Sequence, residues 1–116
     1  MPLIQVFTSA GAPPDAGRAL LTDLSALLAK RFGKPEKWVM TCLVADQAMT
    51  FSGTLAPAAF AAVKNVGKTT PDDTTVLSRE IADRLSRSLD VDRDRIYVEF
   101  TDAVGYLWGW NGETFG

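Results

Sequence analysis

The fold is decided by residues 70–90, which read TPDDTTVLSREIADRLSRSLD. Thr70 has the hydroxyl of a helix N-cap, Pro71 suits the first helical position, and Asp72 begins an acidic first turn that the helix dipole favours. Apolar side chains then recur at helical spacing, in the stripe Leu77, Ile81, Leu85 and Leu89. We therefore predict an amphipathic helix that begins at Pro71 and ends near Asp90.

Segments with the composition of β-strands lie on both sides of this helix. Residues 58–66 and 95–102 are rich in apolar and β-branched side chains, so each predicts a strand. The first half of the chain has the same order, with a strand at 3–8 and a helix at 14–32 that ends before a capping glycine, Gly33.

The strand predicted after the first helix covers residues 38–46. Its sequence is almost continuously apolar, which is typical of a central strand covered on both faces. A shorter strand is predicted at 49–51, ending at Gly53.

The chain therefore consists of two similar halves, and their predicted helices begin at Pro14 and Pro71, about half a chain apart. Two pseudo-symmetric βαβ units predict an α/β fold with a four-stranded mixed sheet and both helices on one face. A length of 116 residues is too short for two cores of normal size. We expect a single domain over 1–116, with half-repeats at about 1–53 and 54–116.

The second face of that sheet has no predicted element to cover it. In the last long strand, alternate side chains point to opposite faces, so Tyr97, Glu99 and Thr101 lie away from the helices. An uncovered sheet face with apolar content predicts an oligomer.

Composition limits the chemistry and the partners. The net charge is −2, and the Lys and Arg residues are scattered, so nucleic acid is not an expected partner. The chain has no histidine and a single cysteine, Cys42, which excludes imidazole bases, an internal disulfide and a four-thiolate zinc site. We expect no cofactor and no metal.

The N-terminal apolar run, residues 2–7, is too short for a signal peptide or a membrane span. The expected location is the cytoplasm, with no membrane partner, although release without a leader stays open.

Pro2 follows the initiator methionine and is the candidate base. Once Met1 is removed, Pro2 carries a secondary α-amine, whose pKa of about 7.7–8.0 is lowered further by an apolar pocket and a nearby cation. A neutral amine of this kind can move a proton between the carbon next to a carbonyl and a neighbouring atom. The alternative is that Pro2 only fixes φ at the start of a strand.

Six short segments occur in order along the whole chain: MPLI at 1–4, GKPE at 33–36, MTFSG at 49–53, VGK at 66–68, DRIY at 94–97 and GWNGETF at 109–115. Together they resemble the macrophage migration inhibitory factor family of the tautomerase superfamily, as a bacterial-type homologue. The resemblance implies a homotrimer with three active sites at subunit boundaries. It also implies keto–enol tautomerisation of α-keto acids such as phenylpyruvate, with the N-terminal proline as the proton shuttle.

The resemblance further implies roles for individual residues. Lys34 holds the substrate carboxylate, the backbone of Val66 contacts it, and Tyr97 is contributed by the adjacent subunit. The remaining substrate-binding candidates are Trp110, Phe115, Leu3, Lys64 and Glu99.

Glu99 departs from the family pattern, because animal members have asparagine at this place. A carboxylate there would repel an anionic substrate, raise the pKa of the proline, or serve as a second general base toward water. A hydratase or decarboxylase activity therefore stays open. So does a trimeric, cytokine-like interaction protein with a vestigial pocket.

Overall fold

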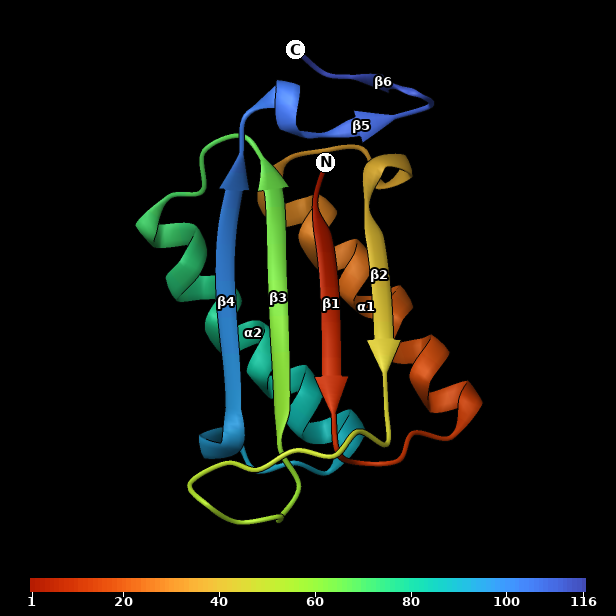
Figure 1. The fold of residues 1–116 in the computed structure, drawn as a ribbon, viewed down its shortest axis with the longest axis vertical. Coiled ribbons are helices and arrows are strands. Elements are labelled where there is room, and N and C mark those ends of the chain that lie inside the picture. The colour runs from red at the N-terminus through yellow and green to blue at the C-terminus, as the bar shows by residue number, and fades with distance from the viewer.

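The computed structural model describes residues 1–116. Two long helices and four long strands form the body, and a small hairpin ends the chain (Figure 1). The elements are β1 (Leu3–Thr8), α1 (Pro14–Phe32), β2 (Met40–Val44), β3 (Ala59–Val66), α2 (Pro71–Leu89), β4 (Ile96–Ala103), β5 (Gly109–Trp110) and β6 (Glu113–Thr114), with short 3-10 turns η1 (Glu36–Trp38), η2 (Arg93–Arg95) and η3 (Gly105–Leu107).

The main sheet has four strands in the order β2-β1-β3-β4. Within each half the two strands are parallel, and the halves meet where β1 and β3 pair antiparallel. Both helices lie on the same face of the sheet (Figure 1). The predicted α/β class, the mixed four-stranded sheet and the placement of the helices are confirmed.

The core lies between this sheet and the two helices. The predicted stripe of α2 is fully or almost fully buried, and Leu20, Leu24 and Leu28 of α1 meet it from the other helix. Ile4 and Val6 of β1 close the core from the sheet side. The helix starts as predicted, because Thr70 accepts a hydrogen bond from the Asp73 N–H and the Asp73 carboxylate accepts one from the Thr70 N–H.

The prediction for the strand at 38–46 was wrong in extent and in position. β2 covers only Met40–Val44, and it is an edge strand rather than a central one. Pro35 precedes the 3-10 turn η1, which takes Trp38 out of the strand. Leu43 of β2 packs against the core, whereas Met40 at the start of this edge strand is 64% exposed.

The strand predicted at 49–51 was also wrong. Phe51 and Thr54 exchange backbone hydrogen bonds as an isolated bridge around Ser52 and Gly53. Both of these residues have positive φ, 54° and 74°, which is the geometry of a tight turn and not of a strand.

The second face of the sheet is uncovered within this chain, as predicted. Tyr97 of β4 is 66% exposed, and its neighbours across the sheet are Phe60 of β3 and then Phe7 of β1. The expected homotrimer remains a prediction that would cover this face.

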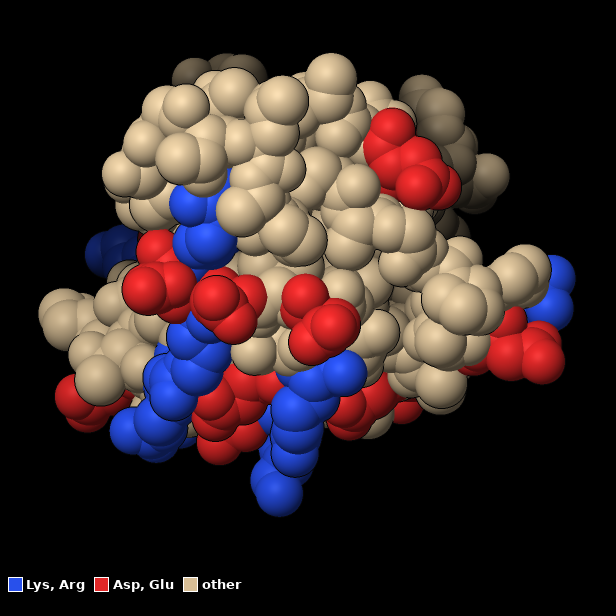
Figure 2. All heavy atoms as spheres, turned by 90° about the horizontal axis from the view of Figure 1, so that it is seen from below, with Lys and Arg blue, Asp and Glu red and all other residues tan.

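Charged side chains of both signs are interspersed on the end of the molecule opposite the two termini, where they do not form a basic patch (Figure 2). Neither α1 nor α2 is long and apolar enough to cross a membrane.

Candidate functional site

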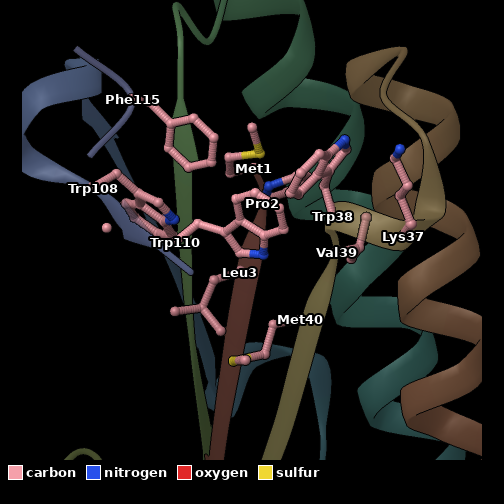
Figure 3. A pocket seen from close by; sticks show the side chains of 11 residues that line it. Met1, Pro2, Leu3, Lys37, Trp38, Val39, Met40, Trp108, Trp110 and Phe115 are labelled. Atoms are coloured by element: carbon pink, nitrogen blue, oxygen red, sulfur yellow. The ribbon is translucent and has the colours of Figure 1, made fainter. Parts of the chain in front are cut away.

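The chain begins and ends at the same end of the sheet (Figure 1). A pocket of about 380 Å³ opens there (Figure 3). Its walls come from the start of β1, from η1 with the start of β2, and from the C-terminal hairpin. The lining residues are Met1, Pro2, Leu3, Lys37, Trp38, Val39, Met40, Trp108, Gly109, Trp110 and Phe115. Eight of these eleven residues are hydrophobic, so the pocket suits a ligand with an apolar part.

Pro2 is fixed at the inner end of this pocket. Its ring is fully buried, and its carbonyl accepts a hydrogen bond of 3.0 Å from the Met40 N–H. The ladder between β1 and β3 begins at the pair Leu3–Lys64, so Pro2 lies just before the strand proper. The position of the chain's first amine is therefore set by the sheet.

The aromatic wall is built by the C-terminal hairpin against η1. Trp38 meets Trp110 edge to face with ring centroids 4.7 Å apart, and Phe115 lies 6.0 Å from Trp38 (Figure 3). The Phe115 N–H donates to the Trp108 and Gly105 carbonyls, each at 3.2 Å. A Cβ at Gly105 would lie 2.7 Å from the Phe115 carbonyl oxygen, so only glycine allows the tail to fold back this closely.

Lys34 lies behind the pocket at the end of α1. The helix ends at Gly33 with φ of 62°, and the Lys34 N–H bonds back to the Ala29 carbonyl at 3.0 Å. This cap sends the side chain toward the end of β3. There its Nζ donates to the Val66 carbonyl at 2.5 Å and to the Asn65 Oδ1 at 3.3 Å.

The N-terminal amine lies beside this cation. Burial, together with the hydrogen bonding and the charge of Lys34, lowers the pKa of the Met1 amine from 8.0 to about 5. An amine with that pKa is neutral at pH 7, which is the form that can accept a proton.

A family model described as Macrophage migration inhibitory factor (MIF) matches residues 1–116 of the chain. The chain belongs to this family. The macrophage migration inhibitory factor of Xenopus tropicalis is 33% identical over 96 residues, covering 83% of this chain and 84% of the relative. The homolog from Trichinella spiralis is 31% identical over 115 residues, covering 99% and 100%.

Solved structures agree with this assignment. The crystal structure of a MIF homologue from Prochlorococcus marinus is 42% identical, has a TM-score of 0.93 and covers 98% of this chain and 99% of its own. The Trichinella spiralis structure is 30% identical, has a TM-score of 0.87 and covers 97% and 99%. The resemblance expected from the sequence segments, to the family and to its bacterial form, is confirmed.

The MIF fold of this chain brings most of the predicted site residues to one end of the sheet. Pro2, Leu3, Trp110 and Phe115 line the pocket. Lys34 and Val66 meet behind it, and the remaining candidate there, Lys64, pairs with Leu3 in the ladder.

Tyr97 and Glu99 are not part of this group. Both are exposed on the open face of β4. In the register of the sheet, Tyr97 is level with Phe7 through Phe60, at the far end of β1 from Pro2. A single chain therefore does not unite the phenol with the amine.

Seven of the eleven lining residues were absent from the sequence-based site: Met1, Lys37, Trp38, Val39, Met40, Trp108 and Gly109. Trp38 was assigned to a strand, so its side chain was read as part of the sheet. The signal that could have placed it is Pro35, since a short turn after proline leaves Trp38 free to face the N-terminus. No group of three or more Cys, Asp or Glu side chains is placed to hold a metal ion.

Proposed function

We propose that this MIF-family protein is a keto–enol tautomerase of a small, phenylpyruvate-like α-keto acid, with the Pro2 amine as the general base after removal of Met1. Membership of the tautomerase superfamily supports isomerase-type chemistry at a coarse level. The observation that carries the finer proposal is the place of the chain's first two residues: Pro2 lines the pocket, and the amine of Met1 before it lies beside Lys34, where its pKa is lowered to about 5.

In the proposed reaction, Lys34 and the backbone of Val66 hold the carboxylate. The neutral amine takes a proton from the carbon next to the carbonyl. The electrons of that C–H bond form the C=C bond, and the carbonyl oxygen becomes the enolate oxygen, which is protonated to give the enol. In the reverse direction the neutral amine takes the proton of the enol hydroxyl as the C=O bond forms again. The ammonium then returns this proton to carbon, where the electrons of the C=C bond form the C–H bond, so the step itself requires no cofactor or metal.

The proposal includes a homotrimer in which a neighbouring subunit supplies Tyr97. Two observations support this arrangement: Tyr97 is 66% exposed, and the sheet face that bears it is uncovered. A phenol placed there would donate a hydrogen bond to the developing enolate oxygen.

The test uses protein whose loss of Met1 is verified by intact mass. Ketonisation of enol-phenylpyruvate is followed by ultraviolet absorbance for the wild type and for Pro2→Gly. We expect the substitution to lower kcat/KM at least about 100-fold, because a positioned base contributes about 10²–10⁴-fold. The matched control is Pro57→Gly, a proline in an exposed loop.

Trimmed wild-type protein that is no faster than buffer would overturn the proposal for this substrate. If such protein is a stable trimer, the interaction protein with a vestigial pocket becomes the better interpretation.

A further inference from the structure

Two lysines of one short loop lie around the N-terminal pocket. Lys34 follows the cap of α1 and reaches the chain's first amine and the Val66 carbonyl. Lys37, one turn later in η1, is the single charged residue among the eleven that line the cavity. No carboxylate lines the cavity between them.

The charge of Lys37 is not neutralised by an ion pair. The acidic neighbour Glu36 is turned away, because its Oε2 accepts a hydrogen bond of 2.9 Å from the Ser25 hydroxyl on α1. The ion pairs of the chain involve only arginines. Lys37 instead rests on the Trp38 ring, with its Nζ 5.1 Å from the centroid (Figure 3).

Trp38 connects Lys37 with the aromatic wall of the pocket. Lys37 lies over its ring, and the rings of Trp110 and Phe115 meet it edge to face (Figure 3). The pocket therefore has an aromatic wall and one cation, Lys37, among its lining residues, and a second cation, Lys34, lies outside the lining beside the chain's first amine.

We infer that the preferred ligand of this pocket is a dianion, namely an aryl or other apolar α-keto acid with a second anionic group at its far end. Lys34 binds the α-carboxylate and Lys37 binds the distal group, while the aromatic wall holds the part between them. The keto-acid part of this assignment rests on the proposed tautomerase function. The preference for two negative charges rests on Lys37 alone.

Lys37 could instead act only as a clamp that orients Trp38. That role requires a cation on the ring but gives no preference between a monoanion and a dianion. Binding experiments with two ligands of the same shape separate the roles.

The probes are 3-phenylpropionate and its para-carboxy derivative, which lack a keto group and cannot react. All three tryptophans of the chain line the pocket, so binding is followed by quenching of tryptophan fluorescence, independently of turnover. The protein is wild type with Met1 removed, at low ionic strength. Lys30→Gln, an exposed lysine at the end of α1 outside this pocket, is the control for the loss of one positive charge.

We expect the dianion to bind wild type and Lys30→Gln about two- to fivefold more tightly than the monoanion, which is the range of a partly exposed ion pair. Lys37→Gln should abolish this preference and leave monoanion binding within about twofold. Lys37→Glu should reverse the preference. The preference should shrink in ~0.5 M salt, where exposed charges are screened.

Equal affinity of the two probes for the wild type, or a preference that survives in Lys37→Gln, would overturn the inference. Loss of binding of both probes in Lys37→Gln would show that the lysine acts only as a clamp on Trp38, which also overturns it. A dianion preference in a protein without ketonisation activity would instead count against the proposed function and leave the dianion site in place.

Discussion

The Nζ of Lys34 donates a hydrogen bond of 2.5 Å to the carbonyl of Val66, which ties the end of α1 to the end of β3 beside the first residue of the chain. No carboxylate of the chain forms an ion pair with this lysine. Its charge is therefore available to an anionic ligand, and the same charge disfavours protonation of the N-terminal amine.

The first prediction concerns the pH dependence of the reaction. The pKa of the Met1 amine is lowered to about 5, and we expect the Pro2 amine in trimmed protein to have a lowered pKa too. The neutral base is then present above that pKa and lost below it, so kcat/KM should be level near pH 7 and fall in acid. Lys34→Ala should move this fall to higher pH, whereas Lys34→Arg should largely preserve it. An unshifted profile in Lys34→Ala would show that the lysine does not set the pKa of the base.

The second prediction concerns Arg95, which holds the loop before β3. Its Nε donates to the Pro57 carbonyl and its Nη2 to the Ala56 carbonyl, each at 2.9 Å. Its guanidinium lies 5.3 Å from the Phe51 ring centroid, and Phe51 in turn packs on Tyr97 at 4.9 Å. Arg95→Ala should lower the free energy of unfolding by about 0.5–1.5 kcal/mol, because water replaces the guanidinium as the donor to these exposed carbonyls.

The same change should lower kcat if Tyr97 completes the pocket of a neighbouring subunit. Arg95→Lys keeps the charge but lacks the planar fork, so it should recover less than half of the lost stability. Arg93→Ala is the control, since its ion pair with Asp83 is on the surface and should contribute little. Thermal melts at fixed protein concentration and the ketonisation assay measure both effects. If Arg93→Ala and Arg95→Ala lower the stability and kcat equally, Arg95 does not have this role.

The third prediction concerns the capping box of α2. Hydrogen bonds from Thr70, first from its backbone N–H, and the Arg31 guanidinium lower the pKa of Asp73 below 3.8. The stabilisation is therefore complete above the ordinary pKa and is lost as the pH falls through the lowered value. Thr70→Ala should lower the free energy of unfolding by about 1 kcal/mol at pH 7, and by less below about pH 4.

Thr75→Ala is the matched control, because this threonine is exposed on the same helix and caps nothing. Chemical denaturation at pH 7 and at pH 3.5 gives the comparison. If Thr70→Ala lowers the free energy of unfolding no more than Thr75→Ala does, the capping box does not stabilise α2. The same holds if the effect of Thr70→Ala is equal at the two pH values.

The same helix shows why much of the fold was predictable. The cap at Thr70 and the stripe that includes Leu77 depend only on near neighbours in the chain, so both could be read directly. The prediction for β2 was wrong because an apolar strand has the same sequence pattern whether a helix, a neighbouring strand or another subunit covers it. The prediction for Trp38 was wrong for a related reason. This residue lies in a 3-10 turn, so its side chain lines the pocket and is not part of the sheet.

The candidate site was predictable only in part, and the resemblance supplied what local patterns could not. Lys34 and Val66 are 32 residues apart, and only the packing of α1 on the sheet brings them together. The pairing of Tyr97 with a pocket depends on a second chain, so no pattern within one chain specifies it.

The last prediction concerns Glu99, the departure from the family pattern. Its side chain is exposed on the open face of β4 and accepts a hydrogen bond from the Thr101 hydroxyl, and no cation of the same chain pairs with it. In the proposed trimer this charge lies near an anionic substrate and opposes its binding.

Glu99→Gln should therefore lower KM for phenylpyruvate about threefold and leave kcat nearly unchanged, since the carboxylate repels the bound substrate and the transition state alike. Asp94→Asn, at an exposed carboxylate of the turn η2 just before the same strand, should leave both constants unchanged. A large fall in kcat for Glu99→Gln with an unshifted pH profile would instead place Glu99 in proton transfer, because a carboxylate that acts only through the pKa of Pro2 would shift that profile. That result would favour a chemistry in which Glu99 activates water, and hydration of an α,β-unsaturated acid would then be the activity to measure in both variants.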